Sequence, residues 1–188
     1  MSINYKRLLS GLFLCCSLQL SGCSVAGFPN GTAVVTPALE SRLVLIAGDG
    51  VELPLTLWKA RGGVAKANLI LLHGFNEYSG AFDEVGETFA RQGVNVWAYD
   101  QRGFGRSAHR GLWAGEARMA QDAREMAALI RKENPELPLT LLGMSMGGAV
   151  TIVAASEASK IDAAVLVAPA VWTRDAQPFY QRWGLDIA

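Results

Sequence analysis

The stretch LTLLGMSMGGAV, residues 139–150, decides the fold of this chain. Its first four residues form an apolar run typical of a buried strand, and its last residues favour a helix. A Gly-x-Ser-x-Gly pattern at residues 143–147 lies between them. A serine on a sharp strand-to-helix turn is held in a strained backbone conformation, and side chains beside it would clash with the strand and the helix. The pattern therefore predicts a nucleophilic Ser145 flanked by Gly143 and Gly147, rather than a tight turn with an incidental serine.

Strands and helices alternate on both sides of this motif. The expected strands are Arg42–Ile46, Val51–Trp58, Ala67–Leu72, Val94–Tyr99, Leu139–Leu142 and Ala163–Val167, and the expected helices cover about 80–92, 116–133 and 146–156. The first two strands flank Gly48-Asp49-Gly50, which is typical of a hairpin. The alternation predicts an α/β fold, with a mostly parallel sheet and helices on both of its faces. Active groups then gather at the carboxyl ends of the strands.

The loop that follows the strand at Ala67–Leu72 begins with His73-Gly74-Phe75. An acyl-transfer site needs two N–H donors for its oxyanion. We expect one from Met146, at the start of the helix, and the other from Phe75. Gly74 lets the backbone and the substrate approach closely, and His73 is expected to make a structural hydrogen bond rather than act as a base.

The turn after the next strand, YDQRGFGRS at residues 99–107, is also rich in glycine. It lacks the lysine and the spacing of a phosphate-binding loop, and its two glycines are too few for a dinucleotide-binding fingerprint. Asp100 and Arg102 are therefore expected to fix the turn. The sequence gives no sign of a metal or an organic cofactor.

The amino-terminal segment has the features of an export signal. Lys6 and Arg7 precede an apolar run, Leu8–Leu20, which is shorter than the roughly 20 residues of a membrane-spanning helix. The run ends in LSGC at residues 20–23, which resembles the lipobox of bacterial lipoproteins. That resemblance implies a signal peptide at 1–22, a lipidated Cys23 and, with serine next, an outer-membrane location facing the periplasm. An ordinary signal peptide that happens to contain cysteine is the alternative.

The remaining chain is expected to consist of a tether and one domain. Residues 23–39 carry the lipidated cysteine and a stretch with Gly, Pro, Asn and Thr but no clear periodicity, and residues 40–188 form the folded part. Cys23 is the last of the three cysteines, so the exported protein has no internal disulfide. The 17 basic and 17 acidic residues balance, and no basic run occurs, which argues against a nucleic-acid partner.

The segments 71–108 and 139–150 together resemble the α/β-hydrolase superfamily. Within it they are similar to the monoacylglycerol lipase, lysophospholipase and serine-aminopeptidase group, over about Leu43 to Val171. The resemblance implies that Ser145 is the nucleophile and that the Phe75 and Met146 amides form the oxyanion hole. It also implies that Arg102 and Gly103 belong to a turn that shapes the pocket floor.

The chain departs from this family after the serine. The family order is serine, acid, histidine, yet no histidine follows His109. We therefore expect the amino-terminal part of a hydrolase domain, without the triad acid and histidine, the last strands and part of the cap, from either a fragment or a disrupted gene. A triad closed by Asp175 and His109 has no counterpart in the family. The aromatics between Trp172 and Trp183 fit a lid or an unpartnered core equally well.

Three functions are compatible with these residues. The first is a lipid-anchored serine hydrolase that cleaves acyl esters such as monoacylglycerols or lysophospholipids through a Ser145 acyl-enzyme. The second is a catalytically inactive envelope lipoprotein that keeps the fold as a binding module, as the missing histidine suggests. The third is a peptidase of the same fold.

Overall fold

The computed structural model describes residues 27–29, 31–41, 43–157, 160–172 and 178–179. The chain divides into a unit of residues 26–171 and a second unit of residues 1–25 and 172–188. The predicted signal peptide 1–22, Cys23 and Asp175 lie outside the described residues. The fold below is that of the first unit.

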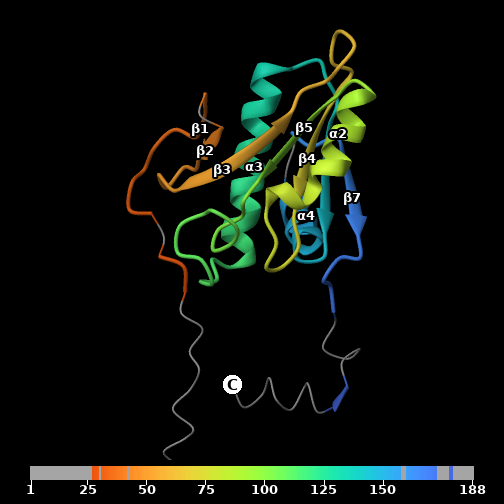
Figure 1. Ribbon diagram of the computed structural model, residues 1–188. Coiled ribbons are helices and arrows are strands. Elements are labelled where there is room, and N and C mark those ends of the chain that lie inside the picture. The colour runs from red at the N-terminus through yellow and green to blue at the C-terminus, as the bar shows by residue number, and fades with distance from the viewer. Residues whose placement is uncertain (1–26, 30, 42, 158–159, 173–177, 180–188) are drawn as a thin grey trace, which may run out of the picture. The chain divides into compact units, whose positions relative to one another are not determined.

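A seven-stranded sheet, in the order β1-β2-β3-β5-β4-β6-β7, forms the centre of this unit (Figure 1). Its strands are β1 (Ala38–Glu40), β2 (Val44–Ile46), β3 (Glu52–Trp58), β4 (Ala67–Leu72), β5 (Val94–Tyr99), β6 (Leu139–Met144) and β7 (Ala163–Val167). The last four are parallel to one another, and β1 to β3 join the sheet by antiparallel pairings. The predicted mostly parallel α/β sheet and its hairpin are confirmed.

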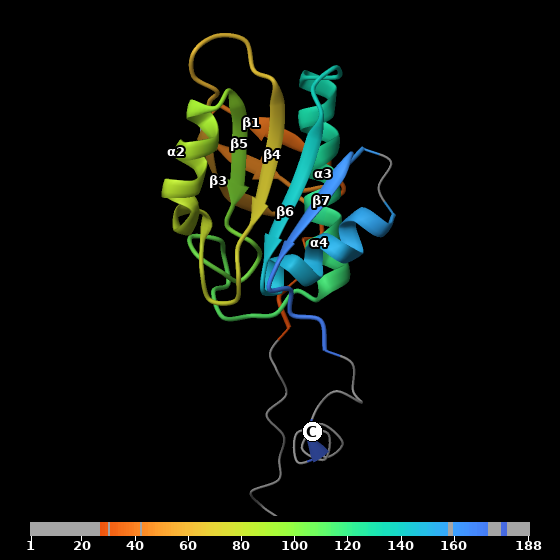
Figure 2. The ribbon, with the colours of Figure 1, turned by 90° about the vertical axis from the view of Figure 1, so that its right-hand side faces the viewer.

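Helices cover both faces of the sheet, as Figure 2 shows with α2 on one side and α3 and α4 on the other. They are α2 (Asp83–Arg91), preceded by the short 3-10 helix η1 (Ser79–Phe82), α3 (Glu116–Glu133) and α4 (Met146–Ser156). Alternate residues of β4 point to opposite faces. Ile70 and Leu72 therefore pack in the core with α3 and α4, whereas Leu69 and Leu71 pack with α2. None of the helices in the described ranges is long and apolar enough to cross a membrane.

Part of the predicted tether packs against the domain. Residues 38–40 form β1, which pairs with β2. Further upstream, the Phe28 side chain is only 6% exposed, and its N–H donates to the Trp113 carbonyl at 2.9 Å. A single large apolar side chain gains by burial even where the surrounding sequence shows no periodicity. The Gly31 N–H donates to Asp49 Oδ2 at 3.2 Å and the Val35 N–H to the Gly48 carbonyl at 3.0 Å, so the described residues of the segment 23–39 contact the domain along much of their length.

The outer strand β7 leads to a prediction about association. Within the described residues β7 pairs with β6 alone, and Val165, Leu166 and Val167 are each 43% exposed. Exposed apolar edges template pairing between chains. We expect the 188-residue chain to self-associate as its concentration rises, and Val165→Lys to reduce this, in size-exclusion chromatography with light scattering. Val64→Lys, in an exposed loop away from the edge, is the control; a monomer that unfolds cooperatively at all concentrations would contradict the expectation.

Candidate active site

Ser145 occupies the sharp turn between β6 and α4. Its backbone has φ 52° and ψ −116°, a conformation that is strained for any residue but glycine. The Ser145 N–H donates to the Val167 carbonyl at 2.9 Å, and the Ser145 carbonyl accepts from the Ala170 N–H at 2.9 Å. Hydrogen bonds to the end of β7 and the segment after it therefore hold the strained residue in place.

The glycines around Ser145 lie where no side chain fits. A Cβ on Gly143 would lie 2.1 Å from the Gly147 carbonyl oxygen, and a Cβ on Gly147 would lie 2.2 Å from the Leu72 carbonyl oxygen. At Gly74 the space is less restricted: a Cβ there would lie 2.9 Å from the Glu77 side-chain Oε2 and in ordinary contact, 3.4 Å, with the Ser145 Cβ. The start of α4 is thus pressed against the end of β4, which brings Ser145 beside the loop that begins at His73.

Two backbone N–H groups at this edge of the sheet, those of Phe75 and Met146, are free for a ligand as far as the described residues go. No hydrogen bond to another described residue occupies the N–H of Phe75 or that of Met146. Met146 is the first residue of α4, so its N–H also lies at the positive end of the helix dipole. The two predicted oxyanion donors are brought to the same sheet edge as the serine. This arrangement can stabilise negative charge on an oxygen bound to Ser145.

His73 is fully buried, and both of its ring nitrogens are engaged. Its Nε2 accepts a hydrogen bond from the Gln101 N–H at 2.9 Å, so the proton is on Nδ1, which donates to the Gly74 carbonyl at 2.8 Å. The Gln101 side-chain amide donates to the His73 carbonyl at 2.8 Å. Burial lowers the pKa of His73 below its usual value. The imidazole is therefore a neutral link between the loops after β4 and β5, with no nitrogen free to take a proton from serine.

Asp100 joins the same two loops through its carboxylate. Its Oδ1 accepts from the Ser79 N–H at 2.8 Å, and its Oδ2 accepts from the Arg106 N–H and Nε at 2.8 and 2.9 Å. Burial of Asp100 would raise its pKa, but hydrogen bonds from Arg106 and Ser79 outweigh it, and the pKa lies below its usual value. Asp100 is an ionised clamp on the turn rather than a proton donor.

Arg102 lies in the interior, between two carboxylates. Its guanidinium donates to Asp122 at 2.7 and 3.0 Å and to Asp49 at 2.7 and 2.8 Å, and it lies 5.6 Å from the centre of the Phe28 ring. These bonds tie the turn to α3, to the β2–β3 hairpin and to the amino-terminal segment. A role for Arg102 in the pocket floor stays a prediction, because its observed contacts are with Asp49, Asp122 and Phe28 and not with a predicted site residue.

The carboxylates of Asp49 and Asp100 should make the fold sensitive to acid. Burial would raise the pKa of Asp49, but its hydrogen bonds and charge interaction with Arg102 lower it from 3.8 to about 2. The stabilisation by Asp49 and Asp100 is therefore fully present above about pH 4 and is lost as the pH falls towards 2. Urea unfolding at several pH values should show the free energy of unfolding falling in that window, and falling less steeply in Asp49→Asn. An equally steep fall in the variant would contradict this assignment.

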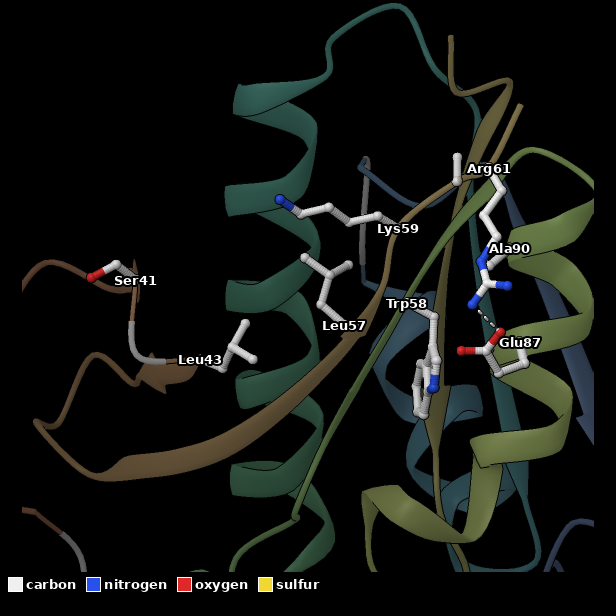
Figure 3. A pocket seen from close by; sticks show the side chains of 9 residues that line it. Ser41, Leu43, Leu57, Trp58, Lys59, Arg61, Glu87 and Ala90 are labelled. Carbon is white, nitrogen blue, oxygen red and sulfur yellow. Dashed lines mark hydrogen bonds and ion pairs between the residues drawn. The ribbon is translucent and has the colours of Figure 1, made fainter. Parts of the chain in front are cut away.

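Two cavities in the described part of the chain lie away from Ser145. One, of about 580 Å³, is lined by residues of β3 and α2 and their surroundings, and an Arg61–Glu87 ion pair lies across it (Figure 3). The other, of about 650 Å³, lies at the start of α3 and is lined by Arg118, Gln121 and Arg124 among others. Neither is lined by a predicted site residue.

Comparisons with known proteins identify the family. The family model described as serine aminopeptidase, S33, matches residues 63–187. Monoglyceride lipase of Rattus norvegicus is 32% identical over 129 residues, which are 68% of this chain and 42% of the rat protein. Monoacylglycerol lipase of Mycolicibacterium smegmatis is 32% identical over 109 residues, 57% of this chain and 39% of that protein. The chain thus spans about two fifths of the length of these relatives.

Solved structures show the same fold. The α/β-hydrolase GrgF of Penicillium is 27% identical, with a TM-score of 0.58 over 67% of this chain and 44% of that one. A soluble variant of the Saccharomyces cerevisiae monoglyceride lipase is 22% identical, with a TM-score of 0.56 over 77% of this chain and 48% of that one. The strained serine, its glycines and these matches agree, and the chain belongs to the serine aminopeptidase S33 family of α/β-hydrolases, in the group that includes the monoglyceride lipases.

Proposed function

We propose that the protein cleaves acyl esters of the monoacylglycerol or lysophospholipid kind, with Ser145 as the nucleophile. The observation that carries this proposal is the backbone of Ser145, held at φ 52° between β6 and α4 beside two N–H groups that have no hydrogen-bond partner among the described residues. The names of the relatives, monoglyceride and monoacylglycerol lipases, support the choice of ester over amide.

In the proposed reaction the Ser145 Oγ attacks the ester carbonyl carbon, and the carbonyl oxygen becomes an oxyanion that accepts hydrogen bonds from the Phe75 and Met146 N–H groups. Collapse of this intermediate breaks the ester bond; the leaving oxygen takes up the proton that the Ser145 hydroxyl gave up and departs as the alcohol, and the acyl group stays on Ser145. Water then attacks the acyl-enzyme and releases the fatty acid. Preorganised donors of this kind contribute on the order of 3 kcal/mol each.

The attack also requires a base for the Ser145 proton. His73 has both ring nitrogens occupied, and the other histidine, His109, packs edge-on against the Phe28 ring at 5.3 Å. Acylation in the 188 residues therefore proceeds without a histidine at Ser145. We expect it to be slower by several orders of magnitude than in a hydrolase with a complete triad.

A substrate panel tests the proposal. The protein is purified from cells and incubated with 1-monoacylglycerols, lysophospholipids and amino-acid nitroanilides. Ser145→Ala is the control. Fatty-acid release that disappears in the control supports the ester hydrolase. Cleavage of the nitroanilides alone would favour the peptidase, and no turnover together with no reaction toward a fluorophosphonate probe would favour the binding module.

We also propose that Cys23 is lipidated and anchors the protein in the bacterial envelope, at the outer membrane facing the periplasm. The support is the sequence alone: Lys6 and Arg7, the apolar run Leu8–Leu20 and the LSGC that ends it. Incorporation of labelled palmitate that is lost in Cys23→Ser is the expected result. Unchanged incorporation in the variant would refute the anchor.

A further inference from the structure

We infer that the sheet edge that carries Ser145 is held facing the lipid layer that contains the acyl chains of Cys23. The inference rests on the proposed lipid anchor and adds an interaction surface and an orientation to it. The amino-terminal segment is attached to the domain close to this edge.

Phe28 fixes the point of attachment. Its side chain is 6% exposed, its N–H donates to the Trp113 carbonyl at 2.9 Å, and Gly27 pairs with Trp113 in a parallel bridge. The Phe28 ring lies 5.6 Å from the Arg102 guanidinium carbon and 5.3 Å from the His109 ring. The first described residue, Gly27, therefore lies against the loop that follows β5, residues 100–115.

This loop lies at the same edge as Ser145. The strands β4, β5 and β6 are parallel, so the segments that follow them share the carboxyl edge of the sheet. Figure 1 shows residues 27–29, at the red end of the colour scale, beside the green loop below the strand arrowheads. The Phe104 ring of this loop contacts Phe75 of the oxyanion loop at 5.3 Å between ring centres.

The distance from the anchor is short. Three residues lie between Cys23 and Gly27, and the four steps from one to the other allow at most about 14 Å of extended chain. The six residues of β4 alone span roughly 20 Å. The opposite edge of the sheet is therefore farther from the attachment point than the chain can reach, and the domain cannot invert. A free tether over all of residues 23–39 would reach about 55 Å and allow any orientation.

The two edges also differ in the side chains that they present. The loop after β4 exposes Phe75 (69%) and Tyr78 (51%), aromatic residues of the kind that sit at membrane interfaces. At the opposite edge, the loop between β3 and β4, residues 59–66, contains no aromatic residue. Exposed cations occur at both edges, so the aromatic side chains distinguish them. A substrate that resides in the lipid layer would therefore meet the oxyanion loop without crossing water.

Fluorescence quenching in vesicles tests this orientation. Lipidated Cys23 has no free thiol, so Tyr78→Cys and Val64→Cys each give the mature protein one cysteine for an environment-sensitive fluorophore. The lipidated protein is reconstituted in phosphatidylcholine vesicles that contain spin-labelled lipid. We expect quenching at position 78 by about half or more and little at position 64, which lies at the opposite edge. Equal quenching at both positions, or stronger quenching at 64, would overturn the inference.

A longer connection provides the matched control. Twelve Gly and Ser residues inserted after Ala26 leave the Phe28 contacts in place and add about 40 Å of extended reach, so quenching at position 78 should fall towards that at position 64. Unchanged quenching would overturn the role of the short connection. Absence of palmitate from the protein would overturn the anchor and the orientation together, whereas palmitate with equal quenching overturns the orientation alone. Reaction of Ser145 with a fluorophosphonate is measured separately, so failure of the proposed chemistry is distinguishable from both.

Discussion

Replacing Gly147 with alanine is expected to lower the free energy of unfolding by at least about 3 kcal/mol, or to prevent folding. The new Cβ would lie 2.2 Å from the Leu72 carbonyl oxygen, 2.6 Å from its carbon and 2.7 Å from the His73 carbonyl oxygen. All three atoms belong to the backbone at the end of the central strand β4, which cannot move without disrupting its pairing with β5 and β6.

Gly27→Ala is the matched control for this prediction. A Cβ at Gly27 meets nothing within 4 Å, so the same substitution should change the free energy of unfolding by less than about 1 kcal/mol. Urea unfolding of the two variants beside the parent protein measures the difference. A loss below about 1 kcal/mol in Gly147→Ala would mean that α4 and β4 are not pressed together as described.

Substitutions of Ser145 should separate its reactivity from its backbone strain. Ser145→Ala and Ser145→Gly are both expected to abolish covalent reaction with a fluorophosphonate, because each removes the attacking oxygen. The free energy of unfolding of Ser145→Gly should be about 1 kcal/mol higher than that of Ser145→Ala, because glycine adopts φ 52° without strain.

The comparison separates a strained nucleophile from an ordinary turn residue. Labelling rates and urea unfolding of the parent and the two variants provide both quantities. Residual labelling in either variant would show that another residue reacts. A glycine variant less stable than the alanine variant would show that the backbone at residue 145 carries no strain.

Most of the sheet could be predicted because its strands are locally encoded. The runs Ala67–Leu72, Val94–Tyr99 and Ala163–Val167 are apolar and bounded by turn residues, and the structure gives β4, β5 and β7 these same bounds. The three residues of β1 carry no such pattern, since they become a strand only by pairing with β2. Pairing between distant segments, rather than local propensity, defines that element.

The candidate site also has parts that neighbouring residues encode and parts that depend on distant contacts. The strained turn at Ser145 could be predicted because the glycines that permit it are its sequence neighbours. The ion pairs of Arg102 could not, because its partners Asp49 and Asp122 lie 53 and 20 residues away. The burial of Phe28 could not be predicted either, because it depends on contacts with the loop after β5. The sequence indicates only that Phe28 is a large apolar residue in an otherwise irregular segment.

The central claim is that Ser145 is the nucleophile of an acyl-ester hydrolase, and the site of fluorophosphonate attachment tests it most directly. The protein, purified as the cell makes it, is labelled and digested with trypsin, and the modified peptide is fragmented in a mass spectrometer. The expected result is one modified peptide, residues 133–160, with the phosphonyl group on Ser145 and not on Ser156 or Ser159. Attachment at another residue, or no attachment at all, would contradict the claim.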